Sequence, residues 1–191
     1  MPQELIAICG PISSGKSSLA RKLHKKDGYR ITPLAEPIRR MIAELISYQG
    51  TSWQEAWNWV TDTVLKETPC PYLNNQTPRF AMQTLGTEWG RTFLDANIWI
   101  NAQKNHTKNE DLYPKVVIDD MRFLNEAKEI KDRGGLILAL DRPGLESSPA
   151  AAHESEQNLA ILFRDATIYN DGTLDDLYKD VSEKIREFQR K

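Results

Sequence analysis

Apolar residues in this chain gather into short continuous runs that alternate with segments of helical spacing. The runs at residues 4–9 and 135–141 contain few polar residues, which is typical of strands buried on both faces. With three similar but shorter runs they predict five strands, at residues 4–9, 29–33, 115–120, 135–141 and 166–169. Because helical segments separate most of these runs, the pattern predicts β-α-β units and a mostly parallel sheet.

Helices are predicted where apolar residues recur at intervals of three and four. Leu19 and Leu23 share one face of a segment that follows the first strand and its loop. Further helices are predicted at residues 38–46, 123–133, 154–163 and 174–188. Three residues are expected to cap the start of a helix. Ser52 and Thr173 are followed three positions later by the acidic residues Glu55 and Asp176, and Thr77 is followed directly by Pro78.

The stretch from residue 52 to about 108 differs in composition from the rest of the chain. It holds all five tryptophans, Trp53, Trp57, Trp59, Trp89 and Trp99. Two or three helices are expected there, as an insertion between strands. Residues 142–152 are rich in Pro, Ser and Ala without periodicity and predict a mobile loop. The length of 191 residues suits a single domain with three α/β/α layers.

Charge and composition exclude several classes of protein. The net charge is −2 and the pI is near 6.0, whereas a nucleic-acid binder needs a basic surface for its phosphate contacts. No apolar run is long enough to span a bilayer and no basic flank opens a signal segment, so we expect a cytoplasmic protein. Cys9 and Cys70 are expected as thiols. The spacing of the cysteines and histidines does not suggest zinc.

The residues after the first strand form a glycine-rich loop with a recognisable pattern. Gly10-Pro-Ile-Ser-Ser-Gly15-Lys16-Ser17 fits G-x-x-x-x-G-K-[ST], and it joins a strand to a helix as that motif requires. Glycines let successive backbone N–H groups point at a phosphate, and the helix N-terminus adds partial positive charge. Lys16 would reach the β and γ phosphates, and the Ser17 hydroxyl would ligate Mg²⁺. The sequence therefore predicts a phosphate-loop nucleotide-binding fold.

Two carboxylates end the third predicted strand. Parallel sheets bind ligands at the carboxyl ends of their strands, so Asp119 or Asp120 is expected to hold magnesium directly or through water. The alternative is that the pair merely caps the following helix, since Asp is a favoured capping residue. Arg122, two residues on, either faces a phosphate from the same edge or pairs with an acidic neighbour.

Four segments in order resemble a known family. They are the phosphate loop, Asp120-Met-Arg122-Phe-Leu-Asn-Glu126, Gln83-Thr-Leu-Gly86-Thr-Glu-Trp-Gly90-Arg91 and His153-Glu-Ser-Glu156. Over about residues 3–180 the chain is similar to the deoxynucleoside monophosphate kinases of tailed bacteriophages. The resemblance implies a core at about 1–34, 113–141 and 164–191, a helical monophosphate-binding insertion at about 35–112 and a lid at about 142–157. It also implies ATP and Mg²⁺ as cofactors and, for a phage protein, the host cytoplasm.

The resemblance assigns the ATP side of the site residue by residue. Phosphate contacts would come from Gly10, Ser13, Ser14, Gly15, Lys16, Ser17 and Ser18. Ser17 and Asp120 would hold the metal. Asn170 and Gly172 lie in a segment similar to the loop that packs on adenine, although the same residues also suit an ordinary tight turn.

The acceptor side would be formed by the insertion together with Arg122. The resemblance implies contacts from Glu36, Arg39, Arg79, Gln83, Thr87, Arg91 and Arg122. Arg79, Gln83, Thr87 and Arg91 are each four apart and form one polar stripe along a helix, a pattern that by itself is typical of a solvated face. Trp53, Trp57 and Trp89 are candidates for a base-stacking platform or for core packing.

The transfer step would be carried by Lys16, Asp120, Arg122 and Arg142. Arg142 opens the lid and is the candidate to reach the transferring phosphoryl group, but Arg122 and Arg164 are alternatives. His153 is expected to order the lid.

Other functions remain open from the sequence. A phosphomevalonate or dephospho-coenzyme A kinase has a similar core, and a non-transferring ATPase or regulator would keep the same loop. No Asn-Lys-x-Asp guanine motif is present, which argues against a GTPase. The expected partners are ATP and a deoxynucleoside 5′-monophosphate, without nucleic-acid polymer or membrane. The sequence does not decide whether the protein forms a homodimer.

Overall fold

The computed structural model describes residues 3–144 and 163–190. The chain divides into two compact units. The first contains Met1–Leu34 and Gln103–Lys191, and the second contains Ala35–Ala102. Residues 154–162 of the expected 154–163 helix and most of the expected lid, including His153, lie outside the described residues.

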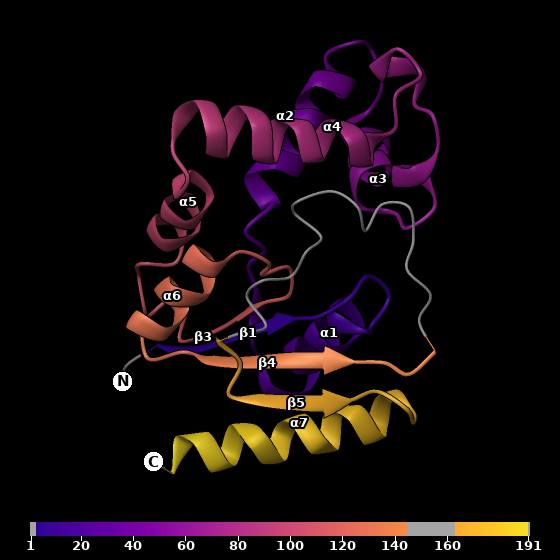
Figure 1. Ribbon diagram of the computed structural model, residues 1–191. Helices are drawn as coiled ribbons and strands as arrows, with labels where there is room; N and C mark the ends of the chain where they lie inside the picture. The colour runs from indigo at the N-terminus through magenta and orange to yellow at the C-terminus, as the bar shows by residue number, and fades with distance from the viewer. Residues whose placement is uncertain (1–2, 145–162, 191) are drawn as a thin grey trace. The chain divides into compact units, whose positions relative to one another are not determined.

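The first unit is built on a five-stranded parallel sheet (Figure 1). Its strands are β1 (Glu4–Cys9), β2 (Arg30–Ile31), β3 (Lys115–Ile118), β4 (Leu136–Asp141) and β5 (Ala166–Tyr169), in the spatial order β2-β3-β1-β4-β5. This confirms the predicted fold class. β2 is shorter than predicted. The backbone N–H of Thr32 still bonds to the Val117 carbonyl, at 3.0 Å, but Pro33 has no N–H to continue the ladder.

Helices cover both faces of this sheet. Ile6, Ile8, Leu138 and Leu140 face one way and pack on α1 (Lys16–Asp27) and α7 (Leu174–Gln189). α6 (Leu124–Asp132) packs on β1 and β4, and Figure 1 shows it on the opposite side of the sheet from α7. The first unit therefore has the predicted three layers.

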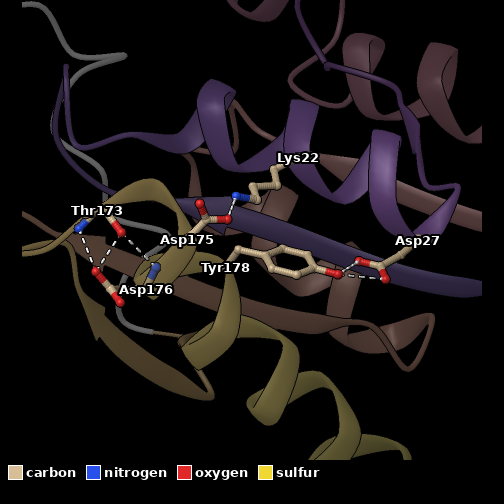
Figure 2. Close-up of polar contacts among 6 residues, drawn as sticks. All are labelled: Lys22, Asp27, Thr173, Asp175, Asp176 and Tyr178. Carbon is tan, nitrogen blue, oxygen red and sulfur yellow. Dashed lines mark hydrogen bonds and ion pairs between the residues drawn. The ribbon is translucent and has the colours of Figure 1, made fainter.

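The seam between α1 and α7 combines apolar packing with polar contacts (Figure 2). Lys22 forms an ion pair with Asp175, and the Tyr178 hydroxyl lies 3.0 Å from both carboxylate oxygens of Asp27. The helix start follows the predicted cap, since Thr173 Oγ1 accepts the Asp176 N–H at 3.2 Å. These contacts fix the segment that precedes α7, where Asn170 and Gly172 lie.

The second unit consists of helices. They are α2 (Glu36–Ser47), α3 (Trp53–Thr61), the 3₁₀ turns η1 (Leu65–Glu67) and η2 (Pro71–Leu73), α4 (Pro78–Thr84), the π-helix η3 (Leu85–Leu94) and the first residues of α5 (Ile98–His106). Ser52 and Thr77 cap α3 and α4 by accepting backbone N–H groups, both at 3.1 Å, as predicted. The unit has its own apolar core, which includes Ile42, Ile46 and Trp99.

Candidate functional site

The loop between β1 and α1 has the backbone form that its sequence predicts. Gly10, Ser13 and Gly15 have positive φ angles of 136°, 64° and 104°. Gly15 is the N-cap of α1, no side chain caps that end, and the first turn carries no acidic residue. The first N–H groups of a helix have no partner within it, so this end of α1 is electropositive and suited to an anion.

Two glycines of the loop lie where no side chain fits. A Cβ at Gly10 would overlap the carbonyl oxygen of Leu140, and one at Gly15 would lie 2.6 Å from Asn170 Nδ2. Asn170 Nδ2 donates to the carbonyl of Ser14 at 2.9 Å, and Asn170 N–H donates to the Asp141 carbonyl at 2.7 Å. Asn170 thus ties the loop to the ends of β4 and β5, a role that the sequence analysis did not foresee.

Gly10→Ala tests this close packing. We expect it to lower the free energy of unfolding by about 3 kcal/mol, because a positive φ angle and a steric overlap add. Gly28→Ala is the matched control, since Gly28 also has a positive φ angle, of 76°, but open space around its Cβ position. Its expected cost is about 1 kcal/mol. Equal urea midpoints for the two variants would contradict the packing at Gly10.

Lys16 lies over the loop that precedes it. Its Nζ donates to the carbonyl of Gly10 at 2.8 Å and also bonds to the carbonyl of Pro11. Burial, with a smaller contribution from the positive charge of Arg122, lowers the pKa of Lys16 to about 8, although Asp119 and Asp120 act in the opposite direction. A cation held with little solvation is well suited to a phosphate ligand.

Asp119 and Asp120 follow β3, which lies beside β1 in the sheet. Both carboxylates are thereby brought to the strand edge where the loop begins. Asp119 is buried, and Asp120 Oδ1 accepts the backbone N–H of Leu34 at 2.8 Å. Neither aspartate is the N-cap residue of α6, which is Phe123, and Glu126 accepts the backbone N–H groups of Arg122 and Phe123.

The three candidate arginines differ in their surroundings. Arg122 is half-buried and acts electrostatically on Lys16. Arg142 follows β4, is exposed, and its Nη1 lies 3.4 Å from the carbonyl oxygen of Ser13. Arg164 is exposed and donates from Nε to Thr167 Oγ1 at 2.9 Å. Arg142 therefore bonds to the loop, whereas Arg122 and Arg164 influence it electrostatically, Arg122 through Lys16 and Arg164 through Cys9, the residue before the loop.

The remaining candidates on this side of the site have simpler settings. Ser17 is exposed in the first turn of α1, and Ser18 Oγ accepts a hydrogen bond from Arg21 at 3.3 Å. The backbone of Gly172 lies against Asp176, where a Cβ would be 3.0 Å from Oδ2.

The polar stripe of the second unit lies on a sheltered face. Arg79, Gln83 and Arg91 are half-buried, and Thr87 is buried with 8% exposure. The neighbouring positions Phe80, Thr84 and Glu88 are exposed instead. Spacing alone favours a solvated face for the stripe, and this expectation is wrong. The solvent-exposed face of α4 and η3 is instead formed by Phe80, Thr84 and Glu88.

Individual members of the stripe are held by specific contacts. Arg79 forms an ion pair with Glu67, and only 14% of its side chain is exposed. The Nε2 of Gln83 is buried and has no hydrogen-bond partner among the described residues. A buried amide in this state costs about 1–3 kcal/mol, which a ligand acceptor would recover.

Two other predicted acceptor residues, Glu36 and Arg39, and the tryptophans lie in the same unit, whereas Arg122 belongs to the first unit. Glu36 pairs with Arg40 at 3.0 Å, and Arg39 is half-buried. Trp53 and Trp57 stack with ring centroids 6.0 Å apart, while Trp89 is 40% exposed. Trp99, which the sequence analysis did not single out, is buried and donates from Nε1 to the carbonyl of Gly86 at 2.7 Å. The spacing of Gly86 and Gly90 within a helical segment was the available signal.

The fold defines the class of protein. Shikimate kinase from Aquifex aeolicus superposes with a TM-score of 0.56 at 12% identity, covering 95% of this chain and 96% of that one. TT1252 from Thermus thermophilus superposes with a TM-score of 0.53 at 19% identity, covering 98% of each chain. Together with the glycine loop and Lys16, this similarity places the chain in the phosphate-loop kinase fold.

Sequence comparison narrows the class to a family. The model of the deoxynucleotide monophosphate kinase family matches residues 60–181. A protein of Acanthamoeba polyphaga mimivirus named "Putative deoxynucleotide monophosphate kinase" is 32% identical over 194 residues, which cover 93% of each chain. The chain belongs to the deoxynucleotide monophosphate kinase family and is a phosphotransferase. This confirms the resemblance found in the sequence and favours it over the other small-acceptor kinases.

Proposed function

We propose that this enzyme transfers the γ-phosphoryl group of Mg-ATP to a deoxynucleoside 5′-monophosphate, giving ADP and the deoxynucleoside diphosphate for DNA precursor supply. The observation that carries the proposal is Lys16, a poorly solvated cation beside the electropositive start of α1. Family membership supports the acceptor class. The viral relative supports action in the cytoplasm of a host cell. As a separate finding, no helix among the described residues is long and apolar enough to cross a membrane.

The ATP phosphates are assigned to the loop and the first turn of α1. The contributing residues are Gly10, Ser13, Ser14, Gly15, Lys16, Ser17 and Ser18. The two glycines keep the backbone free of side chains, and the N–H groups at the start of α1 supply donors. Lys16 would exchange its present carbonyl contacts for phosphate oxygens, which accept more strongly because they are charged.

The donor set suits magnesium. Mg²⁺ prefers oxygen ligands and is usually bound by one or two protein groups plus phosphates and water. We assign the Ser17 hydroxyl and the Asp120 carboxylate as those groups. Ser17 is exposed in the first turn of α1, and Asp120 uses Oδ1 for the Leu34 N–H. When bound, the metal would neutralise charge on the β and γ phosphates.

Adenine is assigned to the segment before α7. Asn170 fixes this segment to the loop, and Gly172 presents backbone without a side chain.

The monophosphate acceptor is assigned to the second unit. The sheltered stripe combines two cations, Arg79 and Arg91, with the polar groups of Gln83 and Thr87, and Glu36 and Arg39 belong to α2 of the same unit. Guanidinium groups bind phosphate in a bidentate manner, and an amide recognises a base edge. The buried, unpartnered Nε2 of Gln83 supports a ligand at this face.

In-line phosphoryl transfer requires little covalent chemistry from the protein. Most of the rate enhancement comes from positioning and from stabilising charge on the transferring group. We assign charge stabilisation to Lys16, Arg122 and Arg142, with Asp120 near the metal and the acceptor phosphate.

The proposal is tested by measuring ADP release from Mg-ATP with each of dAMP, dGMP, dCMP and dTMP and with the corresponding ribonucleotides. Stimulation by one or more deoxynucleotides is expected. Release that no monophosphate stimulates would reject the proposed acceptor class, and stimulation by ribonucleotides alone would reject the deoxyribose assignment.

The pKa of Lys16 makes a further prediction about pH. Because this pKa is lowered to about 8 in the free protein, Lys16 loses its charge as the pH rises above that value. We expect kcat/KM for ATP to fall by about tenfold per unit above pH 8, because this parameter reports the free enzyme. Bound phosphates raise the pKa of Lys16, so kcat itself should stay flatter. Lys16→Arg, which keeps its proton, should lack the fall, and a wild-type kcat/KM that is level to pH 9.5 would contradict the assignment.

A further inference from the structure

The π-helix η3 changes which residues share a face. An α-helix turns by about 100° per residue, so Arg91 would be rotated by about 120° from Arg79 if the helix were regular throughout. A π-helix bonds each N–H to the carbonyl five residues earlier and turns by roughly 80–85° per residue. The bond from Asp95 N–H to the Gly90 carbonyl, at 3.0 Å, is of this kind. Over Leu85–Leu94 the slower turn removes nearly all of the rotation.

Burial along the helix agrees with this realignment. The four positions of the stripe remain half-buried or buried from α4 into η3. Trp89 and Phe93, by contrast, are 40% and 77% exposed. The stripe is continuous because the second half of the helix is a π-helix. A return to α-helical geometry would rotate Thr87 and Arg91 away from Gln83 and Arg79.

Trp99 packs directly on the backbone of this π-helix. Its Nε1 donates to the carbonyl of Gly86 at 2.7 Å, and both groups are buried. At Gly90, one step of four further along, a Cβ would lie 2.7 Å from Cε2 of the Trp99 indole. The ring therefore lies against a strip of bare backbone that these two glycines provide. Gly86 faces Ile38 as well, where a Cβ would lie 3.0 Å from Cδ1.

We propose that Trp99 is a positioning residue for the acceptor nucleotide, because it holds η3 in the π-helical register that aligns Thr87 and Arg91 with Gln83 and Arg79. Trp99 itself does not belong to the polar stripe and acts through the backbone of Gly86 and Gly90. The inference rests on the proposed function, since the stripe is the face assigned to the monophosphate.

Trp99→Phe tests the proposal by removing the N–H donor while keeping an aromatic ring. We expect KM for the deoxynucleoside monophosphate to rise about tenfold, the size of effect that one buried hydrogen bond supports. KM for ATP should change less than about twofold, because the loop and α1 belong to the other unit. Direct titration with the monophosphate by calorimetry should give the same tenfold loss of affinity. Gly90→Ala, which displaces the ring by adding a Cβ, should act in the same direction.

Trp59→Phe is the matched control. Trp59 is half-buried against the same apolar core but belongs to α3, so its substitution should lower stability without changing acceptor KM. If Trp99→Phe and Gly90→Ala lose thermal stability but keep the wild-type acceptor KM and affinity, Trp99 is merely a core residue and the proposal is overturned. Failure of the proposed function is distinguishable, because the wild-type enzyme would then neither bind nor phosphorylate the monophosphate.

Discussion

Lys16→Ala is expected to lower kcat by about 10²–10³-fold while the fold is retained, because one preorganised donor to the transferring phosphates is lost. The structure supports retention of the fold. Among the described residues, Lys16 Nζ bonds to groups of its own loop alone, and its charge is held at a cost in solvation that alanine removes. Steady-state ADP formation and a thermal unfolding curve measure the two quantities.

Lys22→Ala is the matched control for this variant. Lys22 belongs to the same helix, and its ion pair with Asp175, whose side chain is 87% exposed, contributes little to stability. We expect nearly wild-type turnover from it. A Lys16→Ala enzyme that keeps more than about a tenth of the wild-type rate contradicts the role assigned to Lys16.

Arg122→Ala is expected to lower kcat by about 10³-fold, since an arginine that stabilises the transferring phosphoryl group contributes at this scale. Arg122 is half-buried, and its charge contributes to the lowered pKa of Lys16. Its removal should therefore also raise the pKa of Lys16 and move the fall in kcat/KM for ATP to higher pH. A pH series on the variant measures both effects.

Two other arginines make this test selective. Arg142→Ala is expected to lower kcat to a similar degree, because Arg142 lies beside the loop carbonyl of Ser13. Arg164→Ala should cost less than about tenfold, because the Arg164 side chain is exposed and bonded to Thr167. A larger loss for Arg164→Ala than for either other variant would show that the phosphoryl-facing arginine was wrongly assigned.

Local patterns in the sequence predicted most of the fold. Buried parallel strands appear as continuous apolar runs, and β1, β4 and β5 were found at nearly their observed bounds. Ser52 and Thr77 correctly predicted the starts of two helices, because a capping side chain bonds to a backbone N–H only three positions further along. The prediction for β2 was too long, since apolar character alone does not reveal how many residues pair with β3.

The features that were missed depend on contacts between distant residues. Asn170 and Ser14 are 156 positions apart, so no local pattern could reveal that the amide holds the phosphate loop. The π-helix was missed for a related reason. The sequence fits an α-helical interpretation, and the buried contact of Trp99 with Gly86 is visible only in the folded chain.

The residues of the candidate site likewise differ in whether a local sequence pattern or only the folded chain reveals them. Positions in the loop 10–17 follow from the motif, because its chemistry requires glycines and a lysine at fixed spacing. The role of the stripe required structure, since spacing alone favoured a solvated face while Thr87 is buried. The choice among the arginines likewise depended on side-chain contacts, because Arg142 bonds to the Ser13 carbonyl of the loop whereas Arg164 bonds to Thr167 Oγ1.

The central claim is that phosphoryl transfer ends on a nucleotide and not on water. The most direct test follows the label from γ-³²P ATP in the presence of whichever deoxynucleoside monophosphate most stimulates ADP release, with Lys16→Ala as control. We expect label in the deoxynucleoside diphosphate, formed in equal amount to ADP and about 10²–10³-fold more slowly with Lys16→Ala. Label found in inorganic phosphate at the same rate with and without the monophosphate would contradict it.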